Sequence, residues 1–91
     1  LEVTTRGKME LQSLLADIAA FTRSGAISQE AGYELRDSIL AAANEADAPA
    51  PRARRLTAML SRAKEVAAGV TATVGIAEAV DGIIKTLGGG T

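Results

Sequence analysis

The segment from Leu56 to Leu87 carries apolar and small residues at alternating spacings of three and four, which is the period of a stripe along one side of an α-helix. This stripe, called the seam below, consists of Leu56, Met59, Ala63, Val66, Val70, Thr73, Ala77, Val80, Ile84 and Leu87. It passes Gly69 and Gly75 without losing register. A chain with this pattern must bury one side of a long helical segment against other helices.

The composition favours closely packed helices. Of the 91 residues 47% are hydrophobic, but only 2% are aromatic and alanine is abundant. Alanine has the best helix propensity and contributes little to the free energy of burial. We predict an all-α fold, a small helical bundle over residues 8–87 with four helices, or three if the last helix is continuous from Pro51 to Leu87. Residues 1–7 are expected to be a frayed lead-in, and residues 88–91 a glycine-rich tail or linker.

The charged and reactive residues exclude most enzyme classes. The net charge of −1 predicts no global attraction to nucleic acid or to an anionic membrane. The chain has neither cysteine nor histidine, so thiolate chemistry, the commonest metal ligand and the usual general base are missing. Glu30, Glu34 and Asp37 share one helical stripe, but no second cluster completes a metal site. We therefore expect no catalysis, cofactor, metal or small-molecule substrate, and a cytoplasmic location.

The first two helices are expected to form an antiparallel hairpin. The first begins near Lys8 and buries one apolar face, made of Leu11, Leu14, Leu15, Ile18 and Phe21. Gly25 can end this helix in the left-handed conformation, and Ser28 is a good N-cap for the next. The second helix is predicted over 29–46, with Leu35, Ile39, Ala42 and Ala46 buried and Tyr33 at the edge of the core.

Two interpretations stay open for the second half of the chain. Pro49 and Pro51 end the second helix, and Pro51 suits the first position of the third. If the third helix continues to Leu87, it is roughly 55 Å long, which exceeds the diameter of a compact monomer of this size. Either the chain breaks near 69–71, with Gly69 closing one helix and Thr71 capping the next, or a long helix projects and another chain covers it.

The third helix is basic, with Arg52, Arg54, Arg55, Arg62 and Lys64 on its polar side. Because the second helix is acidic, we expect the two helices to lie side by side with matching charges. The alternative is that these five residues grip phosphates of a nucleic acid. No aromatic residues stand among them to stack bases, which favours the first interpretation.

One side of the last helix is a ridge of small residues, which lets two helix backbones approach closely. Its members are Ala67, Thr71, Gly75 and Ala79, followed by Gly82. Ile76 and Ile83 stand beside it, and we expect them to remain partly exposed, because the last helix has more apolar surface than a four-helix monomer can cover. These residues predict contact with a protein partner.

The function predicted from the sequence is therefore a non-catalytic protein-interaction or self-assembly module, an adaptor or oligomerisation domain. Because the chain starts with Leu1, we expect it to belong to a larger protein, and its richness in alanine and arginine suggests a bacterial one. The partner is a second copy or another protein. The alternative is a membrane-active domain whose last helix inserts into a bilayer, although the uncharged run over 66–77 is shorter than a membrane span.

The segment from Leu11 to Leu40 consists of an apolar helix, the turn Ser-Gly-Ala-Ile-Ser-Gln-Glu and a second helix. In this it resembles the short SHOCT-like helical hairpins that are appended to many bacterial proteins. The aromatic residue and the lysine usual in the second helix of that family are absent, and Gly32, Tyr33 and Arg36 stand there instead. We carry no function over from the resemblance.

Overall fold

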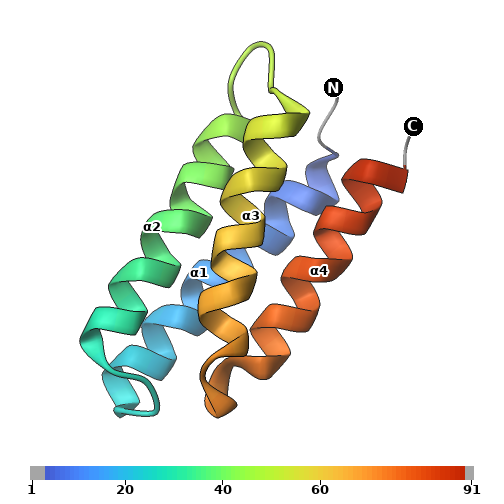
Figure 1. Cartoon of the computed structure of the whole chain (residues 1–91). Coiled ribbons are helices and arrows are strands. Elements are labelled where there is room, and N and C mark those ends of the chain that lie inside the picture. Colours follow the sequence, from blue (N-terminus) through green and yellow to red (C-terminus); the bar gives the residue numbers. More distant parts are fainter. Residues whose placement is uncertain (1–3, 90–91) are drawn as a thin grey trace.

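The computed structural model describes the backbone of residues 4–89 and the side chains of residues 4–86. It consists of four α-helices that run alternately up and down, so that the described chain starts and finishes at the same end of the bundle (Figure 1). The elements are α1 (Thr5–Ser24), α2 (Gln29–Ala46), α3 (Ala53–Ala68), a 3₁₀ turn η1 (Thr71–Thr73) and α4 (Val74–Gly89). The all-α bundle with four helices is confirmed.

Close backbone contacts run between consecutive helices: α1 with α2, α2 with α3, and α3 with α4. All four helices contribute to one core, which is narrow because alanines take up many of its positions. Its fully buried side chains include Leu11, Ile18, Leu35, Ile39, Leu56, Leu60 and Val80. The bundle measures 37 × 20 × 19 Å, so a straight helix of about 55 Å has no place inside it.

The α1–α2 turn follows the prediction. Gly25 has φ 79°, the left-handed conformation that glycine adopts without strain, and it ends α1. The Ser28 hydroxyl accepts a hydrogen bond from the backbone N–H of Ala31 and caps α2. At the other end of α1, the Thr4 hydroxyl accepts from the N–H of Gly7. The predicted lead-in is therefore too long, because a cap at Thr4 starts the helix at Thr5, while residues 1–3 lie outside the described part.

Gly32 is buried where α1 and α2 approach each other. A Cβ atom at this position would collide with the Thr22 side chain, whose hydroxyl donates to the Ile18 carbonyl at 2.8 Å. This contact explains why the helix interior has a glycine. Tyr33, by contrast, was expected to cover the edge of the core, but its side chain is 57% exposed. It lies on the outer face of α2, away from Leu35.

The α2–α3 connection holds Pro49 and Pro51, as expected. The third helix starts two residues later than predicted, at Ala53, because Arg52 has an extended backbone and is its N-cap. The Arg52 backbone N–H donates to Glu45 Oε2 at 3.1 Å. This carboxylate therefore ties the end of α2 to the start of α3.

The α3–α4 junction is broken, so the first of the two open interpretations is right. Gly69 follows α3 in a right-handed conformation, and Thr71 begins η1 without a side-chain cap. The cap interactions come from Thr73 instead. Its side chain is fully buried, and its hydroxyl donates to the carbonyl oxygen of Ala67 at 2.7 Å, with the carbonyl oxygen of Val70 as a second, longer acceptor at 3.2 Å.

The seam stays on the inside across this junction. Thr73, Ala77 and Val80 are buried, and Val66 and Val70 are partly buried against the core. The backbone of α4 continues to Gly89, so Gly88 and Gly89 belong to the helix and not to the predicted tail. The side chain of Leu87 and residues 90–91 lie outside the part that the structure describes.

Thr73→Val is expected to lower the free energy of unfolding by about 1–3 kcal/mol, because the buried Ala67 carbonyl loses the hydroxyl that donates to it. Urea unfolding followed by far-UV circular dichroism measures this. Thr71→Val is the matched control: it makes the same substitution two residues earlier, at an exposed position. Equal losses in both variants would contradict the role assigned to the Thr73 hydroxyl.

Candidate interaction surface

The helix α4 has one buried and one exposed side. Its buried side carries Ile76, Ala77, Val80 and Ile83. The expectation that Ile76 and Ile83 remain partly exposed is wrong, since they are only 4% and 7% accessible. The buried sector of α4 packs on α3 and on the core that all four helices share, and it is wide enough to take in both the seam and this second apolar line.

The ridge of small residues is divided between core and surface. Ala67, in the last turn of α3, is fully buried. Thr71, Gly75 and Ala79 are exposed, as are Gly82 and Thr86 further along. These five exposed residues recur at spacings of 4, 4, 3 and 4 and therefore share one side of η1 and α4. We call them the α4 stripe.

Side chains added at the glycines of the α4 stripe would meet no other described part of the chain. A Cβ atom built on Gly75 or on Gly82 has no neighbouring atom within 4 Å. The sequence analysis predicted that Gly75 and Ala79 belong to the ridge and that Gly82 follows it. It missed Thr86, which the same spacing of four from Gly82 could have indicated.

One edge of the α4 stripe is charged. Asp81 accepts from Lys64 of α3 at 2.8 Å and forms an ion pair with Lys85 of α4 at 2.9 Å. The hydrogen bond from Lys64, followed by that from Lys85, holds the pKa of the Asp81 carboxyl below its ordinary value. The sequence predicted that the charge of Lys64 matches the acidic helix α2, but in the structure Lys64 pairs with Asp81 of α4.

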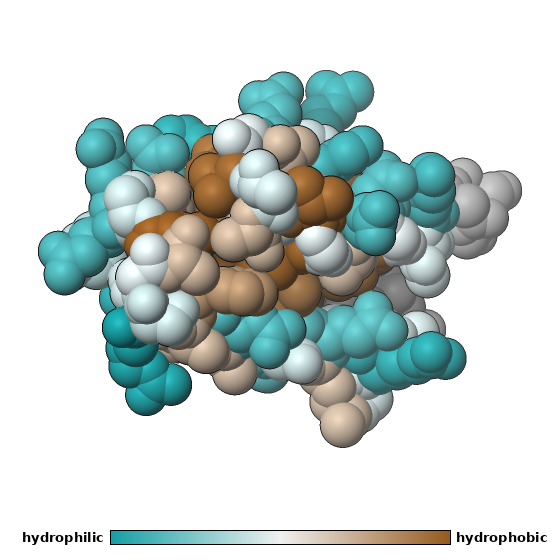
Figure 2. All heavy atoms as spheres, turned by 90° about the horizontal axis from the view of Figure 1, so that it is seen from below, coloured by the Kyte–Doolittle hydropathy of each residue, from teal (hydrophilic) through white to brown (hydrophobic). Residues whose placement is uncertain are grey.

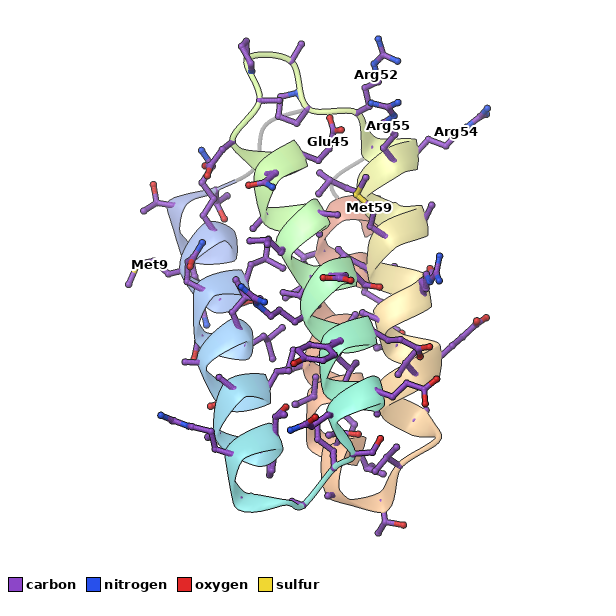
Figure 3. The ribbon with its side chains drawn as sticks, turned by 90° about the vertical axis from the view of Figure 1, so that its left-hand side faces the viewer. Met9, Glu45, Arg52, Arg54, Arg55 and Met59 are labelled. Atoms are coloured by element: carbon purple, nitrogen blue, oxygen red, sulfur yellow. The ribbon has the colours of Figure 1, made fainter. Side chains whose placement is uncertain are left out.

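The basic residues of α3 do not converge on one site. Figure 3 shows Arg52 and Arg54 pointing away from the bundle in different directions, with Arg55 beside Glu45. The Arg55 and Glu45 side chains are 3.7 Å apart, so the expected charge matching between α2 and α3 is found there. Lys64 forms an ion pair with Asp81 of α4. The fifth residue of the predicted patch, Arg62, lies further along α3 than Arg52, Arg54 and Arg55. The five basic side chains therefore do not form a single phosphate-binding cluster.

A shallow groove of about 320 Å³ lies between α2 and α3. Its lining residues are Glu34, Asp37, Ser38, Ala41, Met59 and Arg62. Charges of both signs and one methionine line it, and it is open to solvent. Ser38 carries the one hydroxyl of this lining, and neither a histidine nor a lysine stands beside it among the lining residues.

The end of the bundle that holds the α1–α2 turn and the α3–α4 junction has apolar atoms at its centre. Figure 2 shows this end with hydrophobic side chains surrounded by a hydrophilic rim. The segments that meet there carry the partly buried Phe21, Val66 and Val70, and Val74, which is 44% exposed. The core is therefore less completely covered at this end than along its sides.

Within residues 4–89, no three acidic side chains come close enough to form a metal site, and no helix is both long and apolar enough to cross a bilayer. No protein-family model matches the chain, and neither a curated protein nor a solved structure resembles it closely enough to indicate a relationship.

The lowered pKa of Asp81 predicts how stability depends on pH. The carboxyl has its ordinary pKa in the unfolded chain and a lower one in the folded chain, so its stabilising effect is complete above the unfolded value. The effect is lost as the pH falls through the folded value. We expect Asp81→Asn to lower the melting temperature at pH 7, and the difference from the unmodified chain to shrink below about pH 5.

Thermal unfolding at a series of pH values measures this difference. Asp17→Asn is the control, because Asp17 is an exposed carboxylate of α1 that forms no ion pair among the described side chains. A difference between Asp81→Asn and the unmodified chain that stays constant down to about pH 2 would contradict the assigned role of the ion pairs.

Proposed function

We propose that this domain is a non-catalytic self-association module, in which the α4 stripe of one copy packs against the same stripe of a second copy. The observation that carries the proposal is the open space beside Gly75 and Gly82. Glycine inside a helix costs about 0.5–1 kcal/mol relative to alanine. A glycine at the end of a helix is easily tolerated, but one away from the ends, such as Gly82, calls for a physical reason.

Two other glycines provide a contrast. Gly25 has a positive φ, and Gly32 lies against Thr22, so both are explained within the chain. Gly82 stands in the middle of α4 and has no such contact with the described residues. A second helix that lies close against this position would explain the missing side chain, because small residues allow two backbones to approach within reach of Cα–H···O contacts.

A second copy of the chain fits the stripe when its α4 runs antiparallel. The five positions have nearly the same spacing when read in either direction, 4-4-3-4 against 4-3-4-4. If the two helices cross between residues 79 and 82, Ala79 of each copy lies opposite Gly82 of the other. Gly75 then lies opposite Thr86. A two-fold symmetric contact of this kind closes on itself and forms a dimer.

The charges at the edge of the stripe support the same pairing. Glu78 and Lys85 are both exposed and lie along one edge of the α4 stripe, because seven residues are close to two helical turns. In the antiparallel arrangement, Glu78 of one copy comes near Lys85 of the other, and the two-fold axis repeats this pair. A parallel arrangement would instead place like charges side by side.

The test compares leucine substitutions on two exposed helix faces. Gly82→Leu should raise the dissociation constant of the dimer by more than about tenfold, or about 1.4 kcal/mol, because the added side chain separates the two helices. Helicity should be kept or increased, since leucine is the better helix former. Sedimentation equilibrium over a concentration series, with circular dichroism on the same samples, gives both quantities.

Ala20→Leu on the exposed face of α1 is the matched control and should leave the association unchanged. Gly75→Leu should act like Gly82→Leu. The proposal fails if the unmodified chain stays a 9.3 kDa monomer at all concentrations, or if Ala20→Leu weakens the dimer as much as Gly82→Leu.

A further inference from the structure

The three connections of the bundle differ in how firmly they hold the chain reversal. The α1–α2 turn has Gly25 at φ 79°, and the α2–α3 connection has two prolines. Each of these features disfavours a continuous helix through the connection. The α3–α4 junction, which lies wholly within the described residues, has neither a proline nor a left-handed residue.

At this junction a single residue departs from helical backbone geometry. Gly69 is right-handed with φ −75° and ψ −8°, Thr71–Thr73 form the 3₁₀ turn, and Val74 has φ −57° and ψ −39°. Val70 is extended, with φ −124° and ψ 124°. From Ala53 to Gly89, therefore, a rotation about the backbone of Val70 with small adjustments on either side converts two helices into one.

The sequence is compatible with that single helix. The seam keeps its spacing of three and four through Val66, Val70, Thr73 and Ala77. A helical hairpin does not require this continuity, because each helix of a hairpin can start its own apolar face. One continuous helix does require it.

We propose that Val70 is a hinge at which α3 and α4 straighten into one helix, and that two copies of the chain then exchange their α4 helices. This inference is independent of the proposed function, because it uses the buried side of α4 and not the α4 stripe. In the exchanged dimer, α4 of each copy packs on α3 of the other and makes the interhelical contacts that it makes in the monomer. The hydrogen bond from Thr73 to the Ala67 carbonyl belongs to the reversal and is given up. Exchange of an identical element is a low-cost route to a dimer, since its contacts are conserved.

The ion pair of Lys64 and Asp81 sets the register of this dimer. It joins α3 to α4 within the monomer and would join the two copies after exchange. Because residue 64 of one copy lies beside residue 81 of the other, the two straight helices run antiparallel. The two-fold axis of the dimer then passes between Ala72 and Thr73. The partly buried Val70 of one copy then lies close to the α3–α4 junction of the other.

The hinge can be biased in both directions by substitution. Gly69→Ala combined with Val70→Ala raises the helix propensity of the junction and should convert monomer into exchanged dimer. Thr71→Pro should have the opposite effect, because proline disfavours helical geometry in the preceding residue and favours the extended angles that Val70 already has. Proline is also accepted at the first position of a helical turn, where Thr71 stands.

Distances within one chain distinguish exchange from other dimers. Spin labels at the exposed positions Ala58 and Lys85, on chains diluted with excess unlabelled protein, should lie on neighbouring helices about 10 Å apart in the monomer. In the straightened helix they are separated by about 40 Å. We expect the long distance in the Gly69→Ala/Val70→Ala variant and its loss when Thr71→Pro is added.

A charge-exchange experiment provides a second, independent readout. Lys64→Glu and Asp81→Lys each place like charges across the α3–α4 interface of the same chain. After mixing and refolding from urea, an exchanged heterodimer brings the introduced carboxylate of the first variant beside the introduced amine of the second at one interface. At its other interface it restores the original pair of Lys64 and Asp81, so it is favoured over both single variants. Unexchanged dimers gain nothing from mixing.

We therefore expect a dimer fraction at least severalfold higher in the mixture than in either variant alone. The hinge proposal is overturned if the Gly69→Ala/Val70→Ala variant is folded and shows only the short distance. It is equally overturned if the mixture behaves as the sum of its components. A dimer that shows only the short distance, and that Gly82→Leu dissociates while Thr71→Pro does not, would assign the association to the α4 stripe and overturn the exchange.

Discussion

The reversal of the chain between α3 and α4 is the constraint on which the rest of the bundle depends. It places two halves of one apolar seam against each other, and it is held by the Thr73 hydroxyl on the last turn of α3. Without this reversal the seam would be a single stripe on a helix too long for a molecule with a radius of gyration of 12.4 Å. The bundle therefore depends on two hydrogen bonds of one buried threonine and on the backbone angles of Val70.

The two surfaces of α4 have different physical origins. Its buried side is fixed by α3 and the shared core, where alanines such as Ala63 and Ala77 keep the helices close. Its exposed side is marked by the absence of side chains at Gly75 and Gly82, which no described contact within the chain requires. The buried side of α4 is therefore accounted for by folding. The glycines on its exposed side would be accounted for by contact with a second molecule.

Local signals predicted the helices well, because they act over a few residues. The bounds of α2 are right since Ser28 caps its start and the following prolines enforce its end. The predicted lead-in is too long because the Thr4 side chain caps α1 and starts the helix at Thr5. The predicted tail is too long because α4 continues through Gly88 and Gly89, although glycine has a weak helix propensity. The choice between a broken and a continuous helix stayed open in the sequence, since both forms satisfy the same seam.

Properties that depend on which helices are neighbours could not be predicted from the sequence. The exposure of Ile76 and Ile83 depends on how wide a sector of α4 faces the core, and the partner of Lys64 depends on whether α2 or α4 lies nearer. Periodicity gives the faces of each helix but not the order in which the helices pack. The alignment of Thr71, Gly75, Ala79 and Gly82 could be predicted because these positions follow one helical spacing along a short stretch of chain.

Most close backbone contacts between helices join consecutive helices, and this has a consequence for how the molecule folds and opens. Contacts between chain neighbours give a low contact order, which is typical of domains that fold within microseconds to milliseconds. Each hairpin can form before the next one is added. Since α4 is last in this order and most of its close backbone contacts are with α3 and η1, its amides should exchange with solvent at a lower opening free energy than those of α2, which makes many such contacts with both α1 and α3.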